Sequence, residues 1–499
     1  MLEINGENLT VEDVVRVARF GERVKISESS IRKVKRSRDV VERILKEERV
    51  VYGINTGLGE LVNVRIPKKD LKNLQINLIR SHSSGVGDFL SEEVVRAAML
   101  IRANSLLKGF SGVRLEIIET LISMLNSGVT PLVPKFGSVG ASGDLAPLAH
   151  VALVMIGEGY AKFQGEIMDG KMAMEKAGIK PVEIQEREGL ALLNGTAMMA
   201  AHAAIAVYDS YNIMKNALIS AAMSFEALKA TDGALDERIM RARPHPGQIR
   251  IAKILRELLK DSEIVERARA EKVQDAYTLR CTPQVYGAIL DTLNHVRDVV
   301  EREINSATDN PLIFDEPISG GNFHGEPIAL AMDFLAIALT DMGNMIERRI
   351  ARLVDSKLSN LPPFLIENSG TNSGLMIPQY TAAALCNRNK ILSYPASADS
   401  IPTSANQEDH VSMGMNSAIK LREIVDNVKY IVAIEYLCAN QALHIGGFSA
   451  PAIQRAMRAL GVEKFEVDTV YSPIIERIKR KIDSEEIVRS VEEKINLSL

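Results

Sequence analysis

The stretch Gly137-Ser-Val-Gly-Ala-Ser-Gly-Asp-Leu-Ala-Pro-Leu-Ala-His150 is the most informative part of this sequence. At its centre, Ala141-Ser142-Gly143 has the residues that a backbone cyclisation requires. The amide nitrogen of Gly143 has to reach the carbonyl carbon of Ala141, and glycine tolerates this tight bend because it has no Cβ. Ser142 carries a β-hydroxyl whose loss as water leaves a methylidene group. The product of this reaction would be a 4-methylideneimidazol-5-one ring, an electrophile made from the chain itself.

A structural role explains part of the same stretch. An apolar helix is expected to begin near Leu145, with Pro147 in its first turn, where proline is favoured. Ser142 or Asp144 would then be the N-cap of this helix, because such side chains accept hydrogen bonds from the free amides of the first turn. The tripeptide alone favours this structural role, and only its wider context favours the ring.

The composition is that of a globular protein without a strongly charged partner. The 499 residues are 46% hydrophobic and 25% charged, and the net charge is −4 with both signs well mixed, so neither nucleic acid nor a membrane surface is expected as a partner. The three cysteines, Cys281, Cys386 and Cys438, are too scattered for a disulfide framework or a zinc site. The N-terminus lacks the pattern of a signal peptide, and no long apolar segment predicts a membrane span. We therefore expect a cytoplasmic protein.

Hydrophobic periodicity predicts a mainly α-helical protein in two parts. The first part alternates short helices with loops and includes a small hairpin over 160–170. Residues 197–208 are apolar on every face, as in a helix at the centre of a bundle. Spacings of three and four residues then continue over 289–304, 329–354 and 417–443. We expect an N-terminal mainly helical region, 1–190, that carries the loop around Ser142, and a central long-helix bundle with C-terminal helices, 191–499. The two are expected to act as one functional unit.

Unusual polar side chains lie in the breaks between the expected helices. Tyr52 opens a glycine-rich loop that lacks the lysine and the spacing of a phosphate-binding loop. His82 ends an apolar helix, and Asn194 places an amide in an otherwise apolar run, where it needs a partner. Two later breaks contain Glu408 and, among polar neighbours, the aromatic residue Phe323. Each of these residues alone is more often structural than functional.

One further block carries three polar side chains at regular spacing. Gln274, Tyr277 and Arg280 stand at i, i+3 and i+6, so an expected helix would place them on neighbouring faces. Thr308-Asp-Asn-Pro-Leu follows with no assigned role. Other catalytic templates fail, since there is no His-Glu-x-x-His, no Gly-x-Ser-x-Gly and no dinucleotide-binding glycine pattern. His324-Gly-Glu326 is too little for a metal site, and we expect no metal.

Taken together, these blocks resemble the motif blocks of the aromatic amino-acid ammonia-lyase family. They occur in the same order over about 360 residues, from Tyr52 to Met413. The resemblance implies a largely α-helical protomer whose central bundle is shared in a homotetramer. It also implies active sites that combine residues of three subunits, and elimination of ammonia from an aromatic amino acid. No diffusible cofactor is implied.

The resemblance also implies roles for the residues around the electrophile. Ala141, Ser142 and Gly143 would form the prosthetic ring, and Tyr52 would be the general base. Asn194 and Tyr277 would hydrogen-bond around the ring, with Gln274 beside them. As the base, Tyr52 requires a phenol more acidic than its ordinary pKa of about 10. Helix N-termini directed at the ring would favour the negative charge that develops there.

The remaining matches concern the substrate. Arg280 would hold its carboxylate, a suitable task for the planar guanidinium group, and Phe323 would pack against it. His82, after Ser81, and Glu408 resemble the residues of family members that act on histidine. A carboxylate suits an imidazole, which needs a partner for each ring nitrogen, and would be badly placed against a phenyl ring. The implied products are trans-urocanate and ammonia. Whether the amino group or the imidazole attacks the electrophile stays open.

Several positions depart from the histidine-specific pattern. Ala197 follows Asn194-Gly-Thr where glutamine is usual, and Leu58 stands where phenylalanine is common. Arg388 replaces a usual glutamate, and Thr282 replaces a common glutamine. These departures keep open a tyrosine or phenylalanine ammonia-lyase, or an aminomutase, of the same family. An alternative of another class is a non-catalytic helical scaffold in which the loop stays uncyclised.

Overall fold

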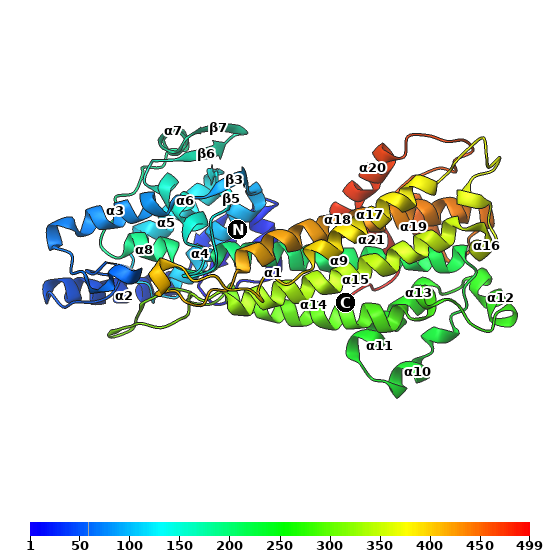
Figure 1. Ribbon diagram of the computed structural model, residues 1–499, viewed down its shortest axis with the longest axis horizontal. Helices are drawn as coiled ribbons and strands as arrows, with labels where there is room; N and C mark the ends of the chain where they lie inside the picture. The colour runs from blue at the N-terminus through cyan, green and yellow to red at the C-terminus, as the bar shows by residue number, and fades with distance from the viewer. Residues whose placement is uncertain (58) are drawn as a thin grey trace. The chain divides into compact units, whose positions relative to one another are not determined.

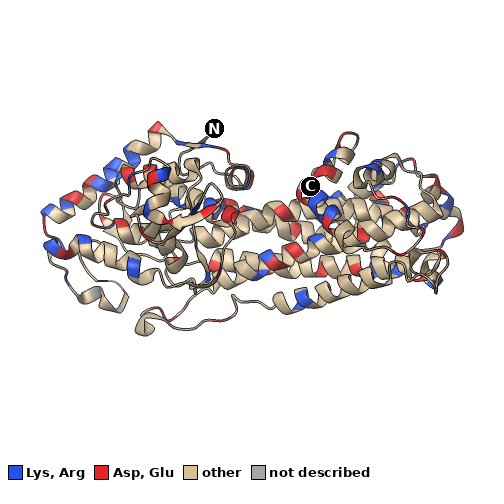
Figure 2. Cartoon of the chain, turned by 90° about the horizontal axis from the view of Figure 1, so that it is seen from above, with Lys and Arg blue, Asp and Glu red and all other residues tan. Residues whose placement is uncertain are grey.

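The structure, a computed structural model, describes residues 1–57 and 59–499, and of Glu60 and Val62 the backbone alone. Leu58, one of the departures noted above, lies outside the described residues. Long helices dominate and the strands are short, which confirms the predicted mainly α class (Figure 1). Residues of both charge signs are mixed along the helices, in keeping with the net charge of −4 (Figure 2).

The chain forms two compact units that alternate along the sequence. The first consists of Met1–Tyr208, Val296–Asp333 and Pro395–Ile419, and the second of Asp209–His295, Phe334–Tyr394 and Lys420–Leu499. Four long helices contribute residues to both units: α9 (Ala197–Ala227), α14 (Thr282–Glu303), α15 (Glu326–Val354) and α18 (Gly414–Gly446). The division between residues 190 and 191 follows chain order and stays a prediction.

The first unit combines short helices with small sheets. Its helices outside the long four are α1 (Val11–Ala18), α2 (Glu28–Lys46), α3 (Leu71–His82), α4 (Glu92–Leu107), α5 (Leu115–Ser127), α6 (Leu145–Met155), α7 (Gly170–Lys176) and α8 (Glu188–Leu193). The paired strands are β1 (Leu2–Ile4) with β2 (Val24–Ile26), β3 (Val86–Phe89) with β5 (Pro134–Phe136), and β8 (Leu312–Ile313) with β9 (Pro317–Ile318). A three-stranded sheet joins β4 (Thr130–Pro131) to the hairpin of β6 (Tyr160–Phe163) and β7 (Glu166–Asp169), which confirms the predicted hairpin.

Local sequence signals explain where several of these helices begin. Thr10 caps α1 through a reciprocal pair of bonds, in which its hydroxyl accepts from the amide of Asp13 and the Asp13 carboxylate accepts from the amide of Thr10. Ser27 and Ser91 occupy the N-cap positions of α2 and α4. Helix α4 is buried on every face between α1 and α5, so it forms the core of the first unit.

The second unit is built mainly from the long helices. It adds α10 (Glu237–Ala242), α11 (Pro246–Leu258), α12 (Glu263–Glu271), α13 (Tyr277–Arg280), α16 (Ser356–Ser359), α17 (Met376–Leu392), α19 (Pro451–Leu460), α20 (Ser472–Asp483) and α21 (Glu486–Glu492). Among the described helices, α15 alone is long and apolar enough to cross a membrane, and 67% of its most apolar window is buried within the protein. Such burial is also what the core helix of a bundle shows.

Candidate active site

The Ala141–Gly143 tripeptide lies in a tight loop that ends at α6. Gly140 and Gly143 pair across the loop, and Gly143 also pairs with Gly195. Gly143 has a φ of +74°, and a Cβ there would lie 2.2 Å from the carbonyl oxygen of Gly195. Both the left-handed backbone and this close approach require glycine. The loop is therefore bent at the residue whose amide nitrogen the predicted cyclisation uses.

Asp144 is fully buried next to this tripeptide. It occupies the N-cap position of α6, but its side chain makes no capping bond there. Its Oδ2 instead accepts from the amide of Met199 at 2.8 Å, in the first turn of α9, where amides lack partners within the helix. Burial raises the pKa of Asp144 to about 7. Asp144 is thus the N-cap residue of α6, as the structural interpretation expected, but its carboxylate contacts α9 instead of capping its own helix.

The loop that carries Glu408 meets the tripeptide loop. The hydroxyl of Ser142 donates to Oε1 of Glu408 at 3.4 Å, and the hydroxyl of Thr403 donates to its Oε2 at 2.6 Å. The amide of Met413 donates to the carbonyl of Val139 at 2.9 Å, which joins the two segments through their backbones. Two blocks that the sequence identified separately therefore come together in the first unit.

Tyr52 and His82 are partly buried in the same unit. Burial raises the pKa of the Tyr52 phenol, which a hydrogen bond with the backbone of Gly59 and the charge of Arg187 oppose. Burial lowers the pKa of His82, and the carboxylate of Glu408 opposes this effect. The greater acidity expected for Tyr52 is therefore not found, because burial outweighs the favourable groups.

Asn194 and Phe323 complete the expected residues of the first unit. Asn194 follows α8 and is buried, and its Oδ1 atom has no hydrogen-bond partner among the described residues. Burial of an acceptor without a donor is unfavourable, so this atom needs a further group. Phe323 is partly buried just before α15.

The fold adds one cluster that the sequence alone did not assemble. Potential metal-binding atoms of His324, Glu326 and His410 lie within 4.8 Å of one another. However, Nδ1 of His324 accepts from the amide of Glu326 at 3.3 Å, and Nε2 faces the carbonyl of His410 at 3.4 Å. Glu326 begins α15, where the helix dipole favours an anion rather than a cation. We assign this cluster to loop packing, since both ring nitrogens of His324 already face protein groups.

The other three expected residues lie in the second unit. Helix α13 contains Tyr277 and Arg280 but begins after Gln274, so the helix predicted to carry all three is shorter than expected. Val273 is fully exposed and Tyr277 is 70% exposed. The guanidinium carbon of Arg280 lies 4.8 Å from the centre of the Tyr277 ring, a cation–π contact.

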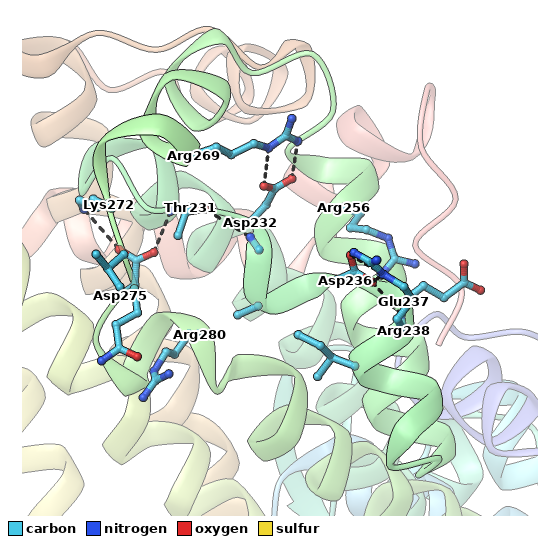
Figure 3. A pocket seen from close by; sticks show the side chains of 15 residues that line it. Thr231, Asp232, Asp236, Glu237, Arg238, Arg256, Arg269, Lys272, Asp275 and Arg280 are labelled. Carbon is cyan, nitrogen blue, oxygen red and sulfur yellow. Dashed lines mark hydrogen bonds and ion pairs between the residues drawn. The ribbon is translucent and has the colours of Figure 1, made fainter.

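Arg280 differs from the other basic residues around it. It lines a cavity of about 900 Å³ together with Gln274 (Figure 3). Arg269 pairs with Asp232 at 2.7 Å, and Lys272 pairs with Asp275 at 3.3 Å. Among the described residues, Arg280 has no ion-pair partner, and its buried Nε has no hydrogen-bond acceptor. An unpaired guanidinium in a cavity suits a carboxylate ligand.

Comparison with known proteins places the chain in a family. Residues 9–461 match the family described as aromatic amino acid lyase. A relative from Thermoplasma acidophilum, named probable histidine ammonia-lyase, is 55% identical over 98% of this chain and 100% of its own length. The crystal structure of histidine ammonia-lyase from Trypanosoma cruzi superposes with a TM-score of 0.93 at 39% identity, covering 99% of this chain and 96% of that one.

A solved structure with a different name is equally similar in fold. Tyrosine aminomutase from Streptomyces globisporus superposes with a TM-score of 0.96 at 38% identity, covering 100% of this chain and 99% of that one. Because the family match covers most of the sequence, the chain belongs to the aromatic amino acid lyase family.

Proposed function

We propose that this protein is a histidine ammonia-lyase, which eliminates ammonia from L-histidine without oxidation and releases trans-urocanate. The observation that carries the proposal is the contact between Ser142 and Glu408, 3.4 Å from Oγ to Oε1. It brings the predicted ring-forming serine next to a carboxylate that can accept a hydrogen bond from an imidazole. Relatives named histidine ammonia-lyase, among them one that is 56% identical over 88% of this chain, support the same substrate.

The loop fits the prosthetic group that Ala141, Ser142 and Gly143 would form. Cyclisation joins the amide nitrogen of Gly143 to the carbonyl carbon of Ala141 and removes two molecules of water. The approach of Gly143 to Gly195 already requires the absence of a Cβ at position 143. Asn194 directly precedes Gly195, and its Oδ1 atom has no hydrogen-bond partner among the described residues. The ring would supply an electrophilic carbon for the substrate and would make any metal or diffusible cofactor unnecessary.

Each of the expected site residues would then have a separate role in the elimination. Tyr52 would remove a proton from the β-carbon, and Glu408 and His82 would orient the imidazole. Phe323 would pack against the substrate. Arg280, in the second unit, would hold the carboxylate. Tyr277 and Asn194 would hydrogen-bond around the prosthetic ring, with Gln274 beside them. Holding the reactants in one orientation supplies a large part of the rate enhancement of such enzymes.

We infer further that the active enzyme is a homotetramer with active sites shared between subunits. The exposed side chain of Tyr277 and the unpaired guanidinium of Arg280 support this arrangement, because a neighbouring subunit would cover them. The small-molecule substrate needs neither nucleic acid nor a membrane as a partner. We propose that the enzyme acts in the cytoplasm.

Ultraviolet absorbance of purified protein tests the proposed activity directly. L-Histidine, L-tyrosine and L-phenylalanine are supplied in parallel, and the conjugated product of each elimination has its own spectrum. Growth of urocanate absorbance with histidine alone is the expected result. A coumarate or cinnamate signal without urocanate would contradict histidine as the substrate while leaving the lyase chemistry in place.

Ala197 supports a second candidate within the family, a tyrosine or phenylalanine lyase or an aminomutase. It is buried at the start of α9, where the histidine-specific pattern has glutamine. Chromatography of the products separates an aminomutase, which yields a β-amino acid, from a lyase. A non-catalytic scaffold would retain both water molecules, so the intact mass of the protein distinguishes it from any cyclised enzyme.

A further inference from the structure

A buried cluster of charges lies beneath the predicted site in the first unit. Arg187, just before α8, is fully buried, and its Nη2 atom contacts Oδ2 of Asp309 at 2.8 Å. Three of its nitrogens also donate to backbone carbonyls: Nε to Ser111 at 3.2 Å, Nη1 to Asn310 at 3.2 Å and Nη2 to Pro311 at 3.0 Å. The guanidinium group therefore holds the segment that begins at Thr308, a block with no role assigned in the sequence analysis.

The cluster contains more positive than negative charge. Arg102, on α4, approaches the same Oδ2 atom of Asp309 at 3.7 Å, so two guanidinium groups share one carboxylate. Arg102 is fully buried, and its Nε and Nη1 atoms have no hydrogen-bond partner among the described residues. Burial lowers the pKa of Arg102 to about 10, which leaves it protonated at neutral pH. An excess positive charge in a buried site favours a nearby anion.

Both arginines touch segments that carry expected catalytic residues. A Cβ on Gly53, the residue after Tyr52, would lie 3.5 Å from Nη1 of Arg187. A Cβ on Gly195, the residue after Asn194, would lie 2.4 Å from Nη1 of Arg102. Glycine at position 195 therefore lets the backbone pack directly against the guanidinium group of Arg102, whereas the guanidinium group of Arg187 lies at an ordinary contact distance from position 53.

We propose that Arg187 is a positioning residue that holds the Tyr52 loop and, through its positive charge, stabilises the phenolate form of Tyr52. The proposal rests on the proposed role of Tyr52 as the general base. The other groups that act on this phenol are the backbone of Gly59, which also favours the phenolate, and the carboxylates of Glu408 and Asp309, which oppose it. Arg187 is thus the charged side chain that offsets the effect of burial.

The pH dependence of kcat/KM tests the proposal with two opposite substitutions. Activity requires the phenolate and rises as Tyr52 loses its proton, so the acid limb of the profile reports its pKa in the free enzyme. Arg187→Gln removes a positive charge and is expected to move this limb to higher pH by about one unit. Asp309→Asn removes a negative charge and is expected to move it to lower pH. At pH values below the acid limb, kcat/KM of Arg187→Gln is then about tenfold lower than that of the unmodified protein.

Arg96→Gln is the matched control. Arg96 is also buried and donates to the carbonyls of Val17, Ala18 and Leu125, but it is not among the charges that act on Tyr52. It is expected to leave the limb in place even where the rate falls. An unchanged limb in both Arg187→Gln and Asp309→Asn would overturn the proposal. Should Arg187→Gln fail to fold, the direction in which Asp309→Asn shifts the acid limb tests the proposal. Loss of packing alone does not move this limb to lower pH.

A second readout is independent of the substrate. The difference in near-ultraviolet absorbance between the protein and its Tyr52→Phe variant, followed against pH, isolates the titration of this phenol. The same difference taken with Arg187→Gln in both proteins is expected to titrate at higher pH. If no amino acid is turned over, this titration still tests the charge effect, so failure of the proposed activity and failure of this inference are distinguishable. An identical titration in the two backgrounds would contradict the proposal.

Discussion

The loop around Ser142 and the segment around Tyr277 carry the two parts of the proposed site, and they differ in how far their side chains are buried. In the first unit Ala141, Asp144 and Asn194 are buried, and backbone contacts fix the loop. In the second unit Tyr277 is 70% exposed, and Arg280 has no ion-pair partner among the described residues. The proposed electrophile would thus form from buried residues of one chain, whereas the segment proposed to bind the carboxylate is presented outward.

This difference has a physical reason. A backbone cyclisation needs a bend that is held before the reaction, and the packing of Gly143 against Gly195 holds it. A carboxylate-binding guanidinium instead has to keep its hydrogen-bond donors free for the ligand. In the proposed tetramer, another subunit would cover the exposed aromatic ring next to it. Changes in the first region should therefore abolish the chemistry, whereas changes in the second should mainly weaken binding.

The largest effect is expected from Ser142→Ala, which would break the first half of the comparison. Alanine has no β-hydroxyl to lose, so the ring cannot acquire its methylidene group. Turnover should fall on the order of 10³-fold or more, with the fold retained. Intact mass spectrometry should show that the variant has not lost water from residue 142. Circular dichroism should show an unchanged helix content. Full activity in this variant would exclude an electrophile derived from Ser142.

A smaller effect, confined to binding, is expected from Arg280→Met in the second unit. Loss of charge-assisted hydrogen bonds to the substrate carboxylate should raise KM by about 10- to 100-fold, with a smaller change in kcat. Steady-state kinetics separate the two parameters. Arg238→Met is the matched control, because Arg238 lines the same cavity but is paired with Asp236 at 2.7 Å. Equal effects of the two substitutions would mean that Arg280 has no special role.

Glu408→Gln would sharpen the comparison by testing selectivity in the first region. A neutral amide keeps the shape but weakens the hydrogen bond to an imidazole, so kcat/KM for histidine should fall about tenfold. Any turnover of tyrosine should change far less. Thr403→Val, which removes the hydroxyl that donates to Glu408 at 2.6 Å, should have a weaker effect in the same direction. Unchanged histidine turnover in Glu408→Gln would argue against histidine as the preferred substrate.

Local signals allowed much of the fold to be predicted from the sequence. The long apolar repeats over 289–304, 329–354 and 417–443 predicted long helices, which the structure confirms as α14, α15 and α18. These features depend on neighbours within one turn or a few turns of a helix. The bend at Gly143 was predictable for the same reason, because the cyclisation itself restricts the residue.

Tertiary contacts explain what the sequence did not reveal. Asp144 bonds to the start of α9 rather than capping its own helix, and Gln274 lies outside the short helix α13. The burial of Arg187 against Asp309 had no local signal either, since a charged residue between two glutamates normally indicates a solvated surface. Contacts between distant segments of chain override such local preferences.

The smallest effect is expected from Arg388→Glu, which tests whether a departure from the histidine-specific pattern matters for function. Arg388 lies on α17 and pairs with Glu423 at 2.6 Å, with half of its side chain exposed. A glutamate there would face Glu423, so the melting temperature should fall by no more than a few degrees, because exposed ion pairs contribute little. Arg388→Gln removes the ion pair without adding repulsion, so its melting temperature should fall less. The ratio of histidine to tyrosine turnover should stay the same in both variants. A changed ratio would mean that α17 of the second unit influences the substrate, and the contrast between a catalytic first region and a binding second region would then have to include this helix.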